Sequence, residues 1–220
     1  MKLFVIWIGK TVLLGLRLFR KSGTALPGLI AERMYPSLMR VMLRKLPHGV
    51  VLVTGTNGKT TTTKIISELF ESQGLRVLSN SSGSNFTRGV FSAIVRHSTW
   101  FGRLEFDVAV FELDEAYSRL FAKQVKPRVV LVTNILRDQL DRYGEIDTTA
   151  NHIRKAISYS GGAILNADDP PVAAMGDALK DPSKVRYYGV SASLRKYLPS
   201  DEEMHGKEAP ELDSAPPKHT

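Results

Sequence analysis

The stretch Val50-Val-Leu-Val-Thr-Gly-Thr-Asn-Gly-Lys-Thr-Thr-Thr-Thr63 decides the fold that this 220-residue chain is expected to adopt. Its first four residues form an apolar, mostly β-branched run, which predicts a short buried strand. Gly55 and Gly58 follow, then Lys59, and apolar residues recur at helical spacing until Gly74, where a helix is expected to end. Strand, glycine loop, Lys-Thr and helix in this order are typical of a phosphate-binding loop.

The polar groups of this loop suit phosphate chemistry. Its glycines let backbone N–H groups point into one concavity, the amine of Lys59 can reach terminal phosphates, and the hydroxyl of Thr60 can ligate Mg²⁺. The common spacing G-x-x-x-x-G-K-[ST] is not kept, because Val53 stands five residues before Gly58. A strand–turn–helix junction with a chance lysine is the alternative. Consecutive threonines are a poor start for a helix, so hydroxyls beside a lysine favour a ligand.

Further apolar segments of strand length follow, and helical patterns separate them. The expected strands are residues 50–53, 75–80, 107–113, 128–134, 162–166 and 185–189; the expected helices are 60–73, 90–97, 146–160 and a short one from Pro170. Strands that alternate with helices predict an α/β fold, a mostly parallel sheet with helices on both faces.

Three acids mark the end of the strand expected at 107–113. Ligands bind at the carboxyl ends of strands in open parallel sheets, and Glu112 is the last inward position of this strand. We expect it to hold Mg²⁺ directly or through water. Asp114 and Glu115 are expected to act as the N-cap and in the first turn of the next helix.

The composition excludes some functions. The chain has no cysteine, which excludes disulfides, a thiolate zinc site and a cysteine nucleophile within it. Its net charge of +8 is uneven, since residues 1–47 hold nine Lys/Arg and one acid. Nucleic acid is not the expected partner, because no aromatic-rich platform accompanies these charges. An anionic membrane surface is the other candidate.

The N-terminal segment predicts helices that precede the first strand. Residues 3–19 are apolar, but Lys10 and Arg17 interrupt them, which argues against a secretory signal and against a membrane-spanning helix. A helix packed on the domain and a helix lying on a membrane surface both remain open. Residues 23–28 predict a turn or linker, and residues 29–46 predict a second basic amphipathic helix.

These patterns divide the chain into three parts. Residues 1–47 are expected to form basic amphipathic helices, and residues 48–198 a nucleotide-binding domain. Residues 199–220 contain four prolines, six acids and no aromatic residue, so they are expected to be a disordered tail or a linker.

Four segments resemble the ATP-binding central domain of the Mur ligase family. They are Thr54-Gly-Thr-Asn-Gly-Lys-Thr-Thr61, Phe111-Glu-Leu-Asp-Glu-Ala116, Thr133-Asn-Ile-Leu-Arg-Asp-Gln-Leu-Asp-Arg-Tyr-Gly144 and Leu165-Asn-Ala-Asp-Asp-Pro170. Within that family the chain most resembles the MurT-type subunits of lipid II isoglutaminyl synthases. The loop begins near residue 54, which leaves no room for a UDP-binding domain, and Gln139 stands where the stepwise ligases usually carry a metal-binding histidine.

The resemblance implies a P-loop NTPase-like domain that binds ATP and Mg²⁺. Gly58, Lys59 and Thr60 would hold the β- and γ-phosphates, Asn85 and Gln139 would line the γ-phosphate and metal side, and Asn166 and Asp169 would hold adenosine. The full set of implied ATP-binding residues is Thr56, Asn57, Gly58, Lys59, Thr60, Thr61, Asn85, Gln139, Asn166 and Asp169. The implied Mg²⁺ ligands are Thr60 and Glu112.

The implied activity is that of an ATP-dependent C–N ligase subunit. It would amidate the α-carboxyl of D-glutamate in the lipid II stem peptide through an acyl phosphate, with ammonia from a GatD-like glutaminase. The protein would then be cytoplasmic and work at the inner face of the membrane.

Two departures from the MurT-type pattern qualify this expectation. Those proteins usually carry a four-cysteine zinc ribbon, so zinc is not expected in a chain without cysteine. They also have a C-terminal domain, whereas this sequence ends at Thr220 and resembles their N-terminal half, so the catalytic residues are expected in the other half. The alternatives are a ligase of the folate-polyglutamate type and a non-catalytic nucleotide-binding fragment.

Overall fold

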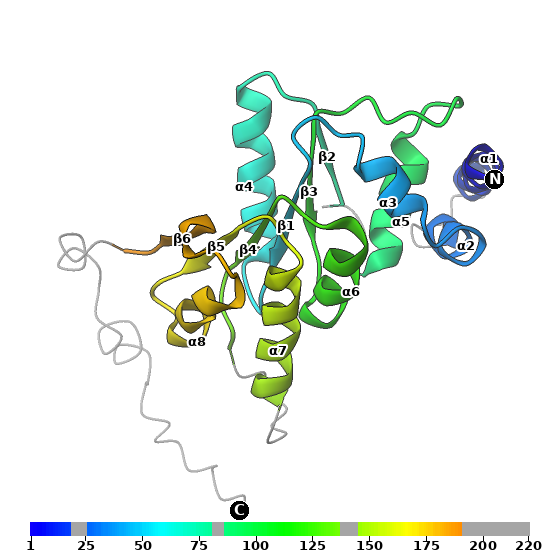
Figure 1. The fold of residues 1–220 in the computed structure, drawn as a ribbon. Helices are drawn as coiled ribbons and strands as arrows, with labels where there is room; N and C mark the ends of the chain where they lie inside the picture. The colour runs from blue at the N-terminus through cyan, green and yellow to red at the C-terminus, as the bar shows by residue number, and fades with distance from the viewer. Residues whose placement is uncertain (19–25, 81–85, 137–144, 191–220) are drawn as a thin grey trace, which may run out of the picture. The chain divides into compact units, whose positions relative to one another are not determined.

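A sheet of six parallel strands forms the centre of the structure, a computed structural model that describes residues 1–18, 26–80, 86–136 and 145–190. The strands are β1 (Val50–Thr54), β2 (Val77–Ser79), β3 (Val108–Glu112), β4 (Val129–Val132), β5 (Ala163–Asn166) and β6 (Val185–Tyr188). Their order is β2-β3-β1-β4-β5-β6, and each neighbouring pair is parallel (Figure 1). The predicted strands and the predicted fold class are confirmed.

Strand β1 lies in the middle of the sheet because its side chains are apolar on both faces. Val50, Leu52 and Val53 are buried, and Leu52 is level with Phe111 of β3 and Val130 of β4. The chain leaves β1 for β2 and β3 on one side and later adds β4 on the other side. The loop after β1 therefore lies at a topological switch point, where open α/β sheets bind ligands.

Helices cover both faces of the sheet, as predicted. On one face, α4 (Lys59–Ser72) packs on β1, β2 and β3. The helices α5 (Thr87–His97), α6 (Glu115–Val125) and α7 (Glu145–Ser158) lie on the other face (Figure 1). The remaining elements are α1 (Lys2–Leu18), α2 (Leu26–Met34), α3 (Leu38–Leu43), α8 (Pro170–Ala173) and the 3₁₀ helices η1 (Ala174–Ala178) and η2 (Pro182–Lys184).

The single helix predicted over residues 29–46 is wrong, because two helices occupy this segment. α2 ends at Met34 and α3 begins at Leu38, with a turn around Pro36 between them. Proline lacks the N–H that a continuing helix needs, and it disfavours the helical conformation in the residue before it. The predicted turn at 23–28 is also wrong from Leu26 onward, because Pro27 lies in the first turn of α2, where proline is favoured.

Helix α5 begins at Thr87, three residues before the predicted start. The carboxylate of Glu32 on α2 accepts a hydrogen bond from Thr87 Oγ1 at 2.8 Å and pairs with Arg88 Nε at 3.3 Å. Glu32 is the one acid in residues 1–47. A contact 55 residues away in sequence thus organises the start of α5. The predicted tail at 199–220 lies outside the described residues.

Helix α1 packs against the domain through one face. Val5 and Ile6 are buried, and Gly9 lies so close to α5 that an added Cβ would stand 2.6 Å from Val95 Cγ1. Large apolar side chains on the other face stay exposed, among them Phe4 and Trp7. In the described part of the chain, no helix combines the length and the apolar character needed to span a bilayer.

Exchanging Lys126 for glycine is expected to stabilise the fold. Lys126 follows α6 in the left-handed conformation, with φ of 54°, and is the one non-glycine residue with positive φ in the described ranges. We expect Lys126→Gly to raise the free energy of unfolding by about 0.5–1 kcal/mol, measured by urea denaturation, because glycine adopts this conformation without strain. Lys123→Gly, which loses the same charge inside the helix, should lower it by about 1 kcal/mol. A Lys126→Gly protein less stable than wild type would contradict the prediction.

Candidate functional site

The predicted phosphate-binding loop connects the end of β1 to the start of α4. Gly58 precedes α4 in the left-handed conformation, with φ of 80°, and the helix begins at Lys59. Gly55 has φ of 127°, and a Cβ at this position would lie 2.3 Å from Thr133 Oγ1 and 2.8 Å from the carbonyl oxygen of Asn134. Both glycines are therefore required, Gly55 by a close approach as well as by its conformation. The loop places the N-terminus of a 14-residue helix at the carboxyl edge of the sheet, which suits an anion.

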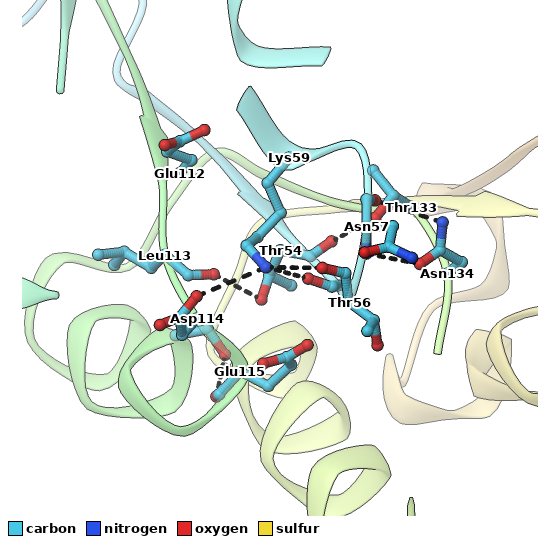
Figure 2. Close-up of polar contacts among 12 residues, drawn as sticks. Thr54, Thr56, Asn57, Lys59, Glu112, Leu113, Asp114, Glu115, Thr133 and Asn134 are labelled. Atoms are coloured by element: carbon cyan, nitrogen blue, oxygen red, sulfur yellow. Dashed lines mark hydrogen bonds and ion pairs between the residues drawn. The ribbon is translucent and has the colours of Figure 1, made fainter. Parts of the chain in front are cut away.

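The amine of Lys59 is partly buried and surrounded by oxygen atoms. It donates to the carbonyl oxygens of Gly55 at 2.7 Å and Thr56 at 3.0 Å, and it lies 3.5 Å from Asp114 Oδ1 (Figure 2). The predicted N-cap role of Asp114 is wrong in its chemistry. Asp114 holds the N-cap position of α6, but its side chain makes no capping hydrogen bond and faces Lys59 instead. Glu115 lies in the first turn of α6, as predicted.

Asn134, which follows β4, fastens the phosphate-binding loop. Its Oδ1 accepts a hydrogen bond from the N–H of Asn57 at 2.8 Å, and its Nδ2 donates to the carbonyl oxygen of Asn57 at 3.3 Å. The N–H of Thr56 donates to the carbonyl oxygen of Asn134 at 2.9 Å, and Thr56 Oγ1 accepts from the N–H of Leu136 at 3.1 Å. The sequence did not single out Asn134. Its signal was its place at the end of a predicted strand, in a segment dense in polar groups.

Glu112 ends β3 beside this loop and is almost completely buried, with 2% of its surface exposed. Its backbone is held by Asn80, whose Nδ2 donates to the Glu112 carbonyl at 2.9 Å and whose Oδ1 accepts from the Glu112 N–H at 3.0 Å. Among the residues that the structure describes, the buried side-chain atom Oε2 has no hydrogen-bond partner. A buried carboxylate oxygen without a partner is costly. Together with the exposed Thr60 at the start of α4, it fits a hard divalent cation that takes its other ligands from water and phosphate.

Asn166 and Asp169, predicted to hold adenosine, organise the loop after β4. Asn166 Nδ2 donates to the carbonyl oxygen of Thr133 at 2.9 Å, and Asp169 Oδ2 accepts from the N–H of Ile135 at 2.9 Å. Asp169 Oδ1 caps α8 by accepting from the N–H of Val172 at 3.1 Å. Burial, and then the negative charges of Asp169 and Asp168, raise the pKa of the nearby Tyr188. Asn166 and Asp169 thus position the segment that carries Asn134, and through this segment they affect the phosphate-binding loop.

The structure brings together most of the predicted site. Thr56, Asn57, Gly58, Lys59, Thr60 and Thr61 form the loop and the first turn of α4. Glu112 lies on the neighbouring strand, which pairs with β1 (Figure 2). Asn85 and Gln139 lie outside the described residues. A helix N-terminus, an amine and a buried acid at one edge of a sheet can bind a phosphorylated ligand together with a metal ion.

Comparison with known proteins identifies relatives of this chain. A family model described as Mur ligase middle domain matches residues 53–209. The chain is 35% identical over 178 residues to the lipid II isoglutaminyl synthase (glutamine-hydrolyzing) subunit MurT of Staphylococcus aureus strain COL. That match covers 80% of this chain and 39% of the relative, so the chain spans about two fifths of the relative's length.

Solved structures share the fold. A pseudomurein peptide ligase type C from Methanothermus fervidus matches with a TM-score of 0.52 and 30% identity, over 67% of this chain and 28% of that chain. The MurF ligase from Thermotoga maritima, in complex with ADP, matches with a TM-score of 0.56 and 20% identity, over 72% of this chain and 36% of that chain.

Proposed function

Because the middle-domain model matches more than half of its length, the chain belongs to the Mur ligase family, and from this premise we propose that it is the nucleotide-binding part of an ATP-dependent carboxylate–amine ligase of peptidoglycan synthesis. The observation that carries the proposal is the loop of residues 55–60, with the Lys59 amine and the buried Glu112 carboxylate at the same edge of the sheet. The sequence identity to a MurT subunit supports the choice of reaction.

In this proposal the loop binds the phosphates of ATP. Gly58 and the N–H groups at the start of α4 face the β- and γ-phosphates, and Lys59 exchanges the carbonyl oxygens of Gly55 and Thr56 for a phosphate oxygen. Thr60 and Glu112 would hold Mg²⁺, which neutralises the charge that develops on the transferred phosphoryl group. Asn134 keeps the loop in place by its hydrogen bonds to Asn57. Thr56, Asn57, Thr61, Asn85, Gln139, Asn166 and Asp169 are proposed as further ATP-binding residues.

The proposed acceptor is the α-carboxyl of D-glutamate in the lipid II stem peptide. A carboxylate oxygen attacks the γ-phosphorus of ATP and ADP leaves, which gives an acyl phosphate. Ammonia then attacks the acyl carbon and phosphate leaves, which gives the amide. The MurT relative is named as a subunit of a glutamine-hydrolysing enzyme, and this chain has no cysteine for thiol chemistry, so we assign ammonia supply to a GatD-like glutaminase partner. The proposed location is the cytoplasm, at the inner face of the membrane.

Replacing Lys59 by alanine is expected to weaken the binding of Mg²⁺–ATP at least tenfold. The substitution removes a charge-assisted hydrogen bond to phosphate, and such bonds contribute about 1.5–3 kcal/mol. Isothermal titration calorimetry on the 220-residue chain measures the affinity. Lys64→Ala is the matched control, because Lys64 is an exposed lysine of the same helix, paired with Glu68 at 3.9 Å. It should bind like wild type, and equal binding by both variants would contradict the role of Lys59.

A turnover assay separates the proposed reaction from its alternatives. The chain, combined with the remaining part of a MurT-type subunit and ammonium, should release ADP in proportion to added lipid II. ADP release that responds to a folate substrate instead would identify a folate-polyglutamate type of ligase. Tight Mg²⁺–ATP binding without turnover on either substrate would favour a nucleotide-binding fragment and contradict the proposed reaction.

A further inference from the structure

A patch of exposed apolar side chains covers the outer face of α1 and the turn at residues 99–102. This aromatic patch consists of Leu3 (40% exposed), Phe4 (59%), Trp7 (50%), Trp100 (53%) and Phe101 (82%). Single exposed apolar residues are ordinary, whereas a contiguous group of large ones indicates an interaction surface. None of the site residues named above belongs to this patch.

The patch is one continuous surface because specific contacts hold the turn against the helix. Trp7 Nε1 donates a hydrogen bond to the carbonyl oxygen of Trp100 at 2.9 Å, and Lys2 Nζ donates to that of Gly102 at 3.0 Å. Gly102 has φ of 69°, and a Cβ there would lie 2.8 Å from Leu3 Cδ2. The turn is closed by the Gly102 N–H, which donates to the carbonyl oxygen of Thr99 at 2.9 Å. A closed and anchored turn therefore presents the largely exposed Phe101 to the exterior.

Helix α1 is apolar on both of its faces. Val5 and Ile6 are buried, while Phe4 and Trp7 stay at least half exposed. A helix on the surface of a water-soluble domain normally carries polar residues on its outer face. The large apolar side chains on the outer face of α1 therefore indicate that a second apolar phase covers this part of the helix.

Two lysines adjoin the patch and identify the kind of phase. Lys10 Nζ lies 5.4 Å from the centre of the Trp100 ring, and Lys2 adjoins the turn. Residues 1–47 carry nine Lys/Arg and one acid. Tryptophan and phenylalanine flanked by lysine are typical of the boundary between a bilayer and water, and the basic excess complements anionic headgroups. We propose that the aromatic patch docks the protein on a lipid bilayer that contains anionic lipids.

The position of the patch agrees with this role. The turn at 99–102 leads to the start of β3, and parallel strands all begin at one edge of the sheet (Figure 1). A cleft of about 520 Å³ at that edge is lined by Arg40, Arg44, Lys123, Lys126 and Arg128, with no acid among its described lining residues. The phosphate-binding loop follows the other end of β1, five residues or about 17 Å away. Docking through the patch would therefore leave the nucleotide-binding edge of the sheet open. The proposal builds on the proposed membrane location and specifies the surface that makes the contact, but its evidence is the patch itself and not the nucleotide site.

The two tryptophans of the chain, Trp7 and Trp100, both lie in the patch, so intrinsic fluorescence reports on it directly. The 220-residue chain is titrated with vesicles of phosphatidylcholine alone and of phosphatidylcholine mixed with phosphatidylglycerol, and binding is checked by co-sedimentation. With the mixed vesicles, we expect the emission to shift to shorter wavelength and the chain to sediment. Phe101→Ser should weaken this binding about tenfold or more, because the inserted ring is lost.

Leu69→Ser is the matched control, because it removes another exposed apolar side chain, from α4. It should bind vesicles like wild type. An unchanged emission with mixed vesicles, or equal binding by Phe101→Ser and wild type, would overturn the proposal. A blue shift that grows with protein concentration without lipid, with a doubled mass in light scattering, would assign the patch to a second copy of the chain and overturn it too. Calorimetry on Phe101→Ser should give wild-type Mg²⁺–ATP binding, so the nucleotide proposal is tested separately.

Discussion

Gly55→Ala is expected to lower the free energy of unfolding by about 2–4 kcal/mol and to weaken Mg²⁺–ATP binding more than tenfold. An alanine Cβ would stand 2.3 Å from Thr133 Oγ1 and 2.8 Å from the Asn134 carbonyl oxygen, closer than non-bonded atoms can approach. Either the loop or the segment after β4 must move, which breaks the hydrogen bonds between Asn134 and Asn57. Urea denaturation and calorimetric titration measure the two effects.

The comparison variant Gly74→Ala separates the steric clash expected at Gly55 from the strain of a positive φ. Gly74 also has positive φ, at 81°, but an added Cβ there meets no atom within 4 Å. This substitution should cost about 1 kcal/mol and leave nucleotide binding unchanged. The difference between the two variants measures the close approach at Gly55. If both lost the same stability and bound nucleotide equally, the contact with Thr133 and Asn134 would not hold the loop.

Glu112→Gln is expected to separate stability from function. The amide keeps the shape of the side chain but removes a buried carboxylate whose Oε2 has no hydrogen-bond partner within the described ranges, so we expect the free energy of unfolding to rise by about 1 kcal/mol. A neutral amide is a much weaker ligand for Mg²⁺ than a carboxylate. The affinity for ATP in the presence of Mg²⁺ should therefore fall about tenfold or more, while the affinity measured with a chelator present should stay near that of wild type.

Glu115→Gln provides the comparison for this result. It removes an equal charge three residues further along the chain, from the first turn of α6. It should leave the Mg²⁺ dependence unchanged and cost a few tenths of a kcal/mol, because an acid near a helix N-terminus is favourable. Unaltered Mg²⁺-dependent binding by Glu112→Gln would remove Glu112 from the proposed metal site. A loss of stability in that variant would instead indicate a structural contact for its carboxylate.

The sheet could be predicted from the sequence because each strand is specified by its own residues. Buried parallel strands need continuous apolar runs, and segments such as Val50–Thr54 and Val108–Glu112 supply them. The phosphate-binding loop was predictable for the same reason, since its glycines, Lys59 and threonines lie next to one another in sequence. Local patterns of this kind do not depend on what the segment packs against.

The features that were predicted wrongly or missed depend on contacts distant in sequence. The side chain of Asp114 makes no capping hydrogen bond and faces Lys59, which lies 55 positions earlier in the chain. The role of Asn134 rests on hydrogen bonds to Asn57, 77 residues away. Such partners follow from the order of the strands, which periodicity does not specify. The break between α2 and α3 has a local cause instead, the proline at position 36. The proline is visible in the sequence, but the basic amphipathic pattern continues across it, and the prediction followed that pattern.

The strand order also determines when this domain can begin to fold during its synthesis. β1 and β2 leave the ribosome first, but they are not neighbours, because β3 lies between them. β1 pairs with β3 and β4, and β2 pairs with β3, so no native strand pair can form until residues 108–112 have emerged. About half of the 220 residues are then already made, with the apolar run of β1 unpaired. Such late, non-local pairing leaves an apolar strand open to aggregation until β3 has emerged.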